Sequence, residues 1–304
     1  MDKLYQKCVR LVVSNTEVKD RDTIEVLAYS ILSLLLVSSD EVLEKIPAIL
    51  QKLTIYSDNR SVLEVLHEEA KHYGEDDELK DALACVTTKM VPRGKDMIEK
   101  NFLILPKSSI HGDPIQMIEK TTHELVHLLR RVSLGKVDNY YVIQDGISTK
   151  RVDLKHHETF KKHSALEEAI VQKRAKDATL SLLEYLKHSK GEKDDSLLYG
   201  ILKEKDSYQS VIYDIHVYLL EMLLEDQDML QRINDTYQTN DVREVSRYFN
   251  NVLDDNGAFL RLSNYFDKLD FALSLGNDKV VYRIIEIIVK EIKSFKEKKK
   301  VYKK

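Results

Sequence analysis

Apolar side chains recur at intervals of three and four residues over most of this chain, a spacing that places them on one face of an α-helix. Polar and charged residues fill the positions between them, so each predicted helix has one face for a core and one for solvent. The segments with this pattern are 22–40, 40–53, 61–74, 164–188, 210–224, 243–253 and 279–295. The pattern therefore predicts helices in the first 80 residues and again from Ser164 to the end.

The pattern changes between these two helical regions. Residues 82–91 and 101–106 are short, partly β-branched runs, bounded by Pro92, Gly94 and Pro106. Runs of this kind between chain breakers are typical of strands.

A hairpin is predicted further along, where Asp145-Gly146 separates two β-prone runs in residues 139–154. A two-residue Asp-Gly turn of this kind requires positive φ at both central residues.

A helix with a clear start is predicted between the two strand regions. Asp113 is a good N-cap residue, Pro114 suits the first helical position, and Gln116 stands where the partner of a capping box is found. The helix should run from Pro114 to about Arg131. Its apolar positions, which include Ile118, lie on one side.

Together these elements predict an α+β fold that is predominantly α-helical. A small antiparallel or mixed sheet should pack on the central helix, with helical regions on both sides. We expect an N-terminal helical region (1–80), a catalytic core (81–190) and a C-terminal helical region (191–304), which could form one continuous globular unit.

The composition is typical of a soluble globular protein. The 304 residues are 43% hydrophobic and 32% charged, with only 9 glycines and 4 prolines. The net charge of −4 gives no general attraction to nucleic acid, and the two cysteines predict no disulfide framework. No signal peptide is apparent, and the most apolar stretch is too short to span a bilayer. We therefore expect a cytoplasmic protein with no membrane span and no nucleic-acid partner.

The chemistry-bearing motif is His123-Glu-Leu-Val-His127 on the central helix. Residues four apart share a helix face, so both imidazoles can bind one zinc ion. Glu124 is offset by about 100° and can take a proton from a water molecule on that ion without binding the metal itself. The longer H-E-x-x-H-x-x-G-x-x-H pattern is excluded, because the chain has Arg130 and Ser133 at its last two fixed positions.

A catalytic zinc needs a third protein ligand. Ser164 and Glu167 form an S-x-x-E capping box, which assigns Glu167 to the surface at a helix start. Glu168 begins an apolar stripe that continues through Val171 and Leu182, so we expect it to point inward.

Three histidines nearby, His156, His157 and His163, are competing ligands. We interpret the segment that contains them as a solvated, lysine-rich connector.

These residues resemble the gluzincins, zinc peptidases in which H-E-x-x-H lies on one helix and a glutamate on a following helix completes the site. Glu168-Ala169 matches the glutamate and small residue of that family, over roughly residues 80–190. The resemblance implies one catalytic zinc held by His123, His127 and Glu168, with Glu124 as the base. Where the family often has a carboxylate that orients a histidine, this chain has Gln172.

The resemblance also implies a downstream tyrosine or histidine that stabilises the oxyanion. The candidates are Tyr208, Tyr213 and His216, of which we select Tyr208 as catalytic.

The predicted function is therefore hydrolysis of peptide bonds in a protein or peptide substrate. An extended substrate would pair with a strand edge, which we place at Phe102–Leu105. The alternatives are a non-catalytic, peptidase-like module that recognises a protein partner through its helical flanks, and a helical scaffold that carries the motif by chance.

Overall fold

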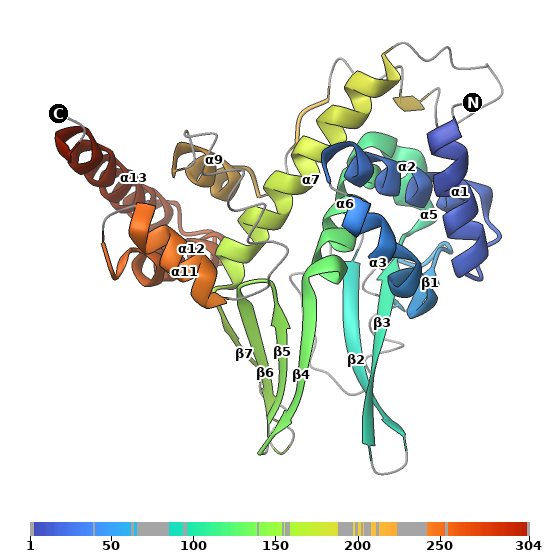
Figure 1. Ribbon diagram of the computed structural model, residues 1–304, viewed down its shortest axis with the longest axis horizontal. Coiled ribbons are helices and arrows are strands. Elements are labelled where there is room, and N and C mark those ends of the chain that lie inside the picture. Colours follow the sequence, from blue (N-terminus) through green and yellow to red (C-terminus); the bar gives the residue numbers. More distant parts are fainter. Residues whose placement is uncertain are drawn as a thin grey trace. The chain divides into compact units, whose positions relative to one another are not determined.

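The computed structural model (Figure 1) divides into two compact units, each built from two segments of the chain. The first unit comprises Met1–Leu129 and Arg174–Ser210, and the second comprises Arg130–Lys173 and Val211–Lys304. The structure describes residues 3–38, 40–61, 64–65, 85–93, 96–138, 140–153, 155, 159–187, 197, 200–201, 203, 208–210, 213–223, 242–252 and 255–302. The predicted helix 61–74 and both predicted domain boundaries, near residues 80 and 190, lie almost wholly outside these ranges.

Helices dominate the first unit. They are α1 (Lys3–Asn15), α2 (Arg21–Val37), α3 (Asp40–Gln51), α5 (Lys107–Gly112), most of α6 (Pro114–Arg130) and the C-terminal half of α7 (Ser164–Leu186). The predicted helix 22–40 is α2, which begins where the Asp20 carboxylate accepts a hydrogen bond from the Thr23 amide. Among the described helices, none has both the length and the apolar composition to cross a bilayer.

Two serines in the apolar run of α2 join this helix to α6. Ser30 Oγ donates to the carbonyl of Ile118 at 3.2 Å, and Ser33 Oγ lies 3.1 Å from Thr122 Oγ1. Ser30, Ser33 and Thr122 are all completely buried. The serines that interrupt the apolar pattern therefore fix α6 against α2.

A three-stranded mixed sheet completes the first unit, as the sequence predicts in outline. It contains β1 (Leu53–Tyr56), β2 (Cys85–Arg93) and β3 (Asp96–Ile104) in the order β1-β3-β2. β2 and β3 pair antiparallel, and β1 pairs parallel to β3. Strand β1 was not predicted, because it closely follows α3 in a region where the apolar spacing is typical of helices.

The position of β3 corrects the proposed substrate-binding edge. Thr54 pairs with Phe102 on one side of β3, and Thr87 pairs with Phe102 on the other. Phe102 and the residues that follow it are buried. The prediction of an exposed edge at Phe102–Leu105 is therefore wrong, because β3 is the central strand of its sheet.

The start of α6 agrees with its predicted N-cap. The Asp113 carboxylate accepts a hydrogen bond of 2.9 Å from the Gln116 amide, and Pro114 occupies the first helical position. α6 ends at Arg130, close to the predicted Arg131.

The second unit contains a four-stranded antiparallel meander. Its strands are β4 (Arg131–Val137), β5 (Tyr140–Asp145), β6 (Ser148–Asp153) and β7 (Thr159–Lys162), in chain order. The predicted hairpin is β5–β6. Asp145 pairs with Ser148, so the turn residues are Gly146 and Ile147, and only Gly146 has positive φ (55°). The predicted turn was therefore one residue out of register, and its two positive φ values were wrong.

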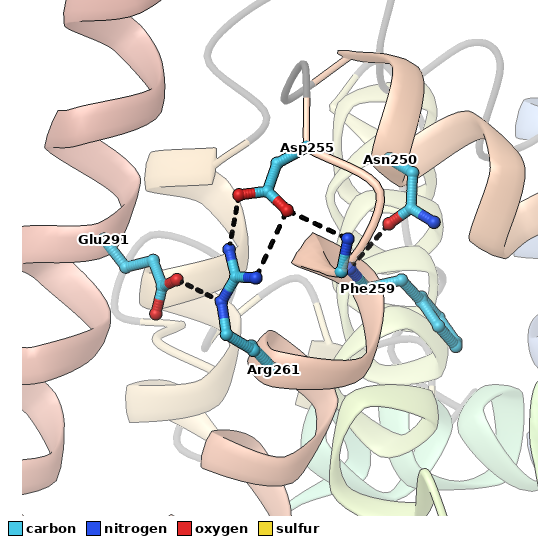
Figure 2. A network of polar contacts seen from close by, with 6 residues as sticks. Asn250, Asp255, Phe259, Arg261 and Glu291 are labelled. Atoms are coloured by element: carbon cyan, nitrogen blue, oxygen red, sulfur yellow. Dashed lines mark hydrogen bonds and ion pairs between the residues drawn. The ribbon is translucent and has the colours of Figure 1, made fainter.

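The C-terminal helices of the second unit are α9 (Asp214–Leu223), α11 (Val242–Val252), α12 (Ala258–Ser274) and α13 (Asp278–Tyr302). Three of them, α9, α11 and α13, coincide with predicted segments, whereas α12 was not among the predicted segments. Figure 2 shows how the start of α12 is held: Arg261 donates to Asp255 and to Glu291 of α13, both at 2.7 Å. Asn250 Oδ1 of α11 accepts from the Phe259 amide at 3.0 Å. This polar network joins three helices at one point.

Replacing Asp113 by alanine should lower the free energy of unfolding by about 1 kcal/mol, because the Gln116 amide loses its acceptor. Asp113→Asn keeps a side-chain oxygen and should cost much less. Denaturant unfolding of the three proteins measures the difference. Equal losses in both variants would contradict the capping role.

Candidate metal centre

The two histidines of the motif face each other on α6. Their Nε2 atoms are 3.0 Å apart, and their rings lie 4.7 Å apart at 69°. Both side chains are buried, His123 at 1% and His127 at 8% exposure. This is the arrangement that the four-residue spacing predicts for two imidazoles on one helix face.

Glu168, in the first turns of α7, is the third member of the predicted group. One ligand atom from each of His123, His127 and Glu168 lies within 4.8 Å of the other two. Two nitrogens bound to one tetrahedral zinc at about 2.0–2.1 Å stand about 3.3 Å apart, close to the distance between the two Nε2 atoms. The donor set therefore fits zinc with two imidazoles and one carboxylate.

The predicted base, Glu124, is buried at 5% exposure and follows His123 directly. Its carboxylate lies 3.2 Å from the ammonium group of Lys120, one helical turn earlier. Glu124 is not one of the grouped ligand residues. A carboxylate next to a candidate metal group, without being a member of it, is in the position that a general base needs.

Glu167 has a different role from the one predicted. It is buried at 1% exposure, and its carboxylate forms two hydrogen bonds with Arg130, at 2.6 and 2.9 Å. It also accepts a hydrogen bond of 3.0 Å from the Ile147 amide. The prediction of a surface capping-box residue is wrong, because a tertiary ion pair takes this carboxylate into the interior.

The start of α7 is capped from another helix instead. Asp267 of α12 accepts hydrogen bonds from the amides of His163 (3.2 Å) and Ala165 (3.0 Å). A carboxylate at this position also interacts favourably with the helix dipole. The apolar stripe predicted to follow Glu168 is present, since Val171, Ala175, Ala178 and Leu182 are all buried.

The sequence suggested that His163 belongs to a solvated connector, but the structure shows otherwise. Its Nδ1 atom lies 2.6 Å from Ser263 Oγ, and its ring contacts Phe259. Burial lowers the pKa of His163 below its ordinary value, although the charge of Asp267 opposes this. The residues just before His163 form strand β7. The other two competing ligands, His156 and His157, lie outside the described residues.

Tyr208 lies near α6, beside Glu119, which is one helical turn before His123. Ser210 Oγ donates to the fully buried Glu119 carboxylate at 2.6 Å. Burial, and then the negative charge of Glu119, raise the pKa of Tyr208 above its usual value. The phenol therefore stays protonated at neutral pH and can act as a hydrogen-bond donor.

The other two oxyanion candidates lie in the second unit. His216 is buried at 2% exposure, packs against the rings of Tyr213 and Phe266, and lies 3.8 Å from the Asp270 carboxylate. Burial lowers its pKa to about 4, although the charge of Glu168 acts in the opposite direction. His216 is therefore a neutral imidazole at physiological pH.

Three residues of this region were missed in the sequence. Glu119 and Lys120 stand four residues before His123 and Glu124, so the helical spacing could have placed them beside the motif. Arg130 was considered only because it excludes a longer motif. Its partner Glu167 is 37 residues away, and no local pattern connects the two.

Comparisons with protein families, curated proteins and solved structures find no match to this chain.

Purified protein should bind about one zinc ion per chain at neutral pH, and Glu168→Ala should weaken that binding by orders of magnitude. Glu184→Ala, an exposed position on the same helix, is the matched control and should bind zinc as the wild type does. Elemental analysis and competition with a chromophoric chelator measure both values.

Acid should release the metal, because imidazole must be neutral to bind it. The prediction fails if wild-type protein incubated with zinc carries none, or if the two variants retain zinc equally.

Proposed function

We propose that this protein is a zinc-dependent peptidase of the gluzincin type. The observation that carries the proposal is the convergence of His123, His127 and Glu168 on one small volume, with the Glu124 carboxylate next to it in sequence. A structural zinc site has four protein ligands, whereas three ligands leave a position for a reacting molecule. A purely structural zinc site needs no general base, so it would give no reason for a carboxylate at position 124.

The residues of the chain have separate roles in this proposal. His123, His127 and Glu168 would hold the metal. A zinc ion in such a site supplies Lewis acidity, which makes a water molecule acidic near neutral pH and polarises a carbonyl group. Glu124 accepts the proton of the attacking water and delivers it to the leaving amine, since its carboxylate is close to the ligands without being one of them.

Tyr208 is the proposed donor to the developing oxyanion. Its phenol is protonated at neutral pH, and the contact between Ser210 and Glu119 holds the segment 208–210 against the helix that carries the histidines. A donor fixed before the reaction stabilises negative charge without a reorganisation cost. The substrate class is a peptide or protein, because zinc with a glutamate base on H-E-x-x-H is suited to amide hydrolysis.

Glu124→Gln should keep zinc and fold normally while losing most proteolysis, because an amide cannot accept the proton. Cleavage of a peptide library, read by mass spectrometry, measures activity, and elemental analysis measures zinc. Glu184→Gln is the control for loss of one negative charge. A variant at position 124 that cleaves as fast as wild type would exclude Glu124 as the base.

If wild-type protein binds zinc but cleaves no substrate, the peptidase-like binding module becomes the better description.

Tyr208→Phe should retain zinc and lower kcat by about 10²–10³-fold, the usual cost of removing one oxyanion donor. KM should change little, since the interaction is made in the transition state. Steady-state kinetics on a cleaved peptide tests this. If kcat is unchanged, Tyr208 only packs against Glu119, and His216 becomes the residue to replace next.

A further inference from the structure

A buried ion pair lies between the end of α6 and the start of α7. Arg130 Nε and Nη2 donate to the two carboxylate oxygens of Glu167, at 2.6 and 2.9 Å. The exposed fractions of the two residues are 4% and 1%. Such a two-point contact fixes both the distance and the relative rotation of its partners, which a single-point contact does not.

The β5–β6 turn lies directly on this ion pair. The Ile147 amide donates to Glu167 Oε2 at 3.0 Å, and the Gly146 amide donates to the Arg130 carbonyl at 3.3 Å. A Cβ atom on Gly146 would lie 2.1 Å from Glu167 Oε1 and 2.2 Å from Arg130 Nη2. A side chain at position 146 would therefore have to displace the ion pair.

Both partners are close in sequence to the proposed zinc ligands. Arg130 follows His127 by three residues on α6, and Glu167 immediately precedes Glu168 on α7. A rotation of the first turn of α7 that moved the Glu167 carboxylate would move the Glu168 carboxylate by a similar amount, since both belong to one helical turn.

We propose that Arg130, Glu167 and Gly146 are positioning residues that hold Glu168 in place as the third zinc ligand. This inference rests on the proposed function. A buried ion pair is a weak source of stability compared with apolar side chains of similar size, because both charges must be removed from water. Its directional geometry is the property that apolar packing lacks, and partners that orient metal ligands are known to set metal affinity.

The sharpest test compares two glycines. Gly146 (φ +55°) and Gly276 (φ +60°) have similar backbone conformations, but a Cβ on Gly276 meets nothing within 4 Å. Gly276→Ala therefore reports the backbone strain alone, whereas Gly146→Ala adds displacement of the Arg130–Glu167 pair. We expect Gly146→Ala to weaken zinc binding by about 10–100-fold and Gly276→Ala to leave it unchanged. Competition with a chromophoric chelator measures zinc affinity without any substrate.

A double variant separates positioning from stability. Arg130→Met/Glu167→Met replaces the ion pair by apolar side chains of similar size, and should fold even where a single replacement does not. The inference predicts that its thermal unfolding without metal resembles that of the wild type, while its zinc affinity stays at least tenfold lower. Substitution with Co²⁺ should also give a visible absorption spectrum that differs from the wild-type spectrum, as a change in ligand geometry requires.

Wild-type zinc affinity and an unchanged cobalt spectrum in both Gly146→Ala and the double variant would overturn the positioning role. If Glu168→Ala still abolished zinc binding in that case, the proposed metal site would stand without it. If the wild type itself bound no zinc, the proposed function and this inference would fail together.

Discussion

The structure depends on a helix that buries an unusual number of polar side chains. α6 has to satisfy these groups within the protein, because a buried polar group without a partner costs free energy. The buried polar residues of α6 are Glu119, Thr121, Thr122, His123, Glu124, His127 and Arg130. Much of the surrounding architecture supplies their partners: Ser33 for Thr122, Ser210 for Glu119, and Glu167 for Arg130.

The two histidines of α6 also contact each other. Their Nε2 atoms point at each other across 3.0 Å, and a hydrogen bond between neutral imidazoles uses only one donor and one acceptor. A shared cation would use both nitrogens as ligands and would also take up the Glu168 carboxylate. A shared metal is the role that we propose for this pair, and it would account for two imidazoles at buried positions of one helix face.

Local signals in the sequence were sufficient for the frame of the site. The N-cap at Asp113, the extent of α6 and the existence of the β5–β6 hairpin each depend on contacts within a few residues, and each was predicted. The predominantly helical α+β class followed from periodicity alone. The grouping of His123 with His127 is likewise a property of one helix, and Glu168 was selected first from the apolar stripe that follows it and then from the resemblance to a known family.

The errors arose where distant segments compete with a local pattern. A capping box assigned Glu167 to the surface, but Arg130 attracts its carboxylate inward and Asp267 caps the helix instead. The run that contains Phe102 has the composition of any strand, and its central position depends on β1, which lies some 50 residues earlier in the chain. The local spacing of apolar and polar residues predicts neither an ion pair nor the order of strands between segments that are tens of residues apart in the chain.

Glu167 and Glu168 are adjacent acidic residues at the start of α7. Two neighbouring acidic residues at a partly buried helix start repel each other, and each charge raises the cost of burying the other. Arg130 neutralises the first and fixes its direction, while the second is left about 100° away around the helix axis. One carboxylate can then serve as an anchor and its neighbour as a ligand. In the proposed metal site, the ion pair would allow α7 to present Glu168 as a charged ligand beside a second buried carboxylate, and this would account for an arginine at the end of α6.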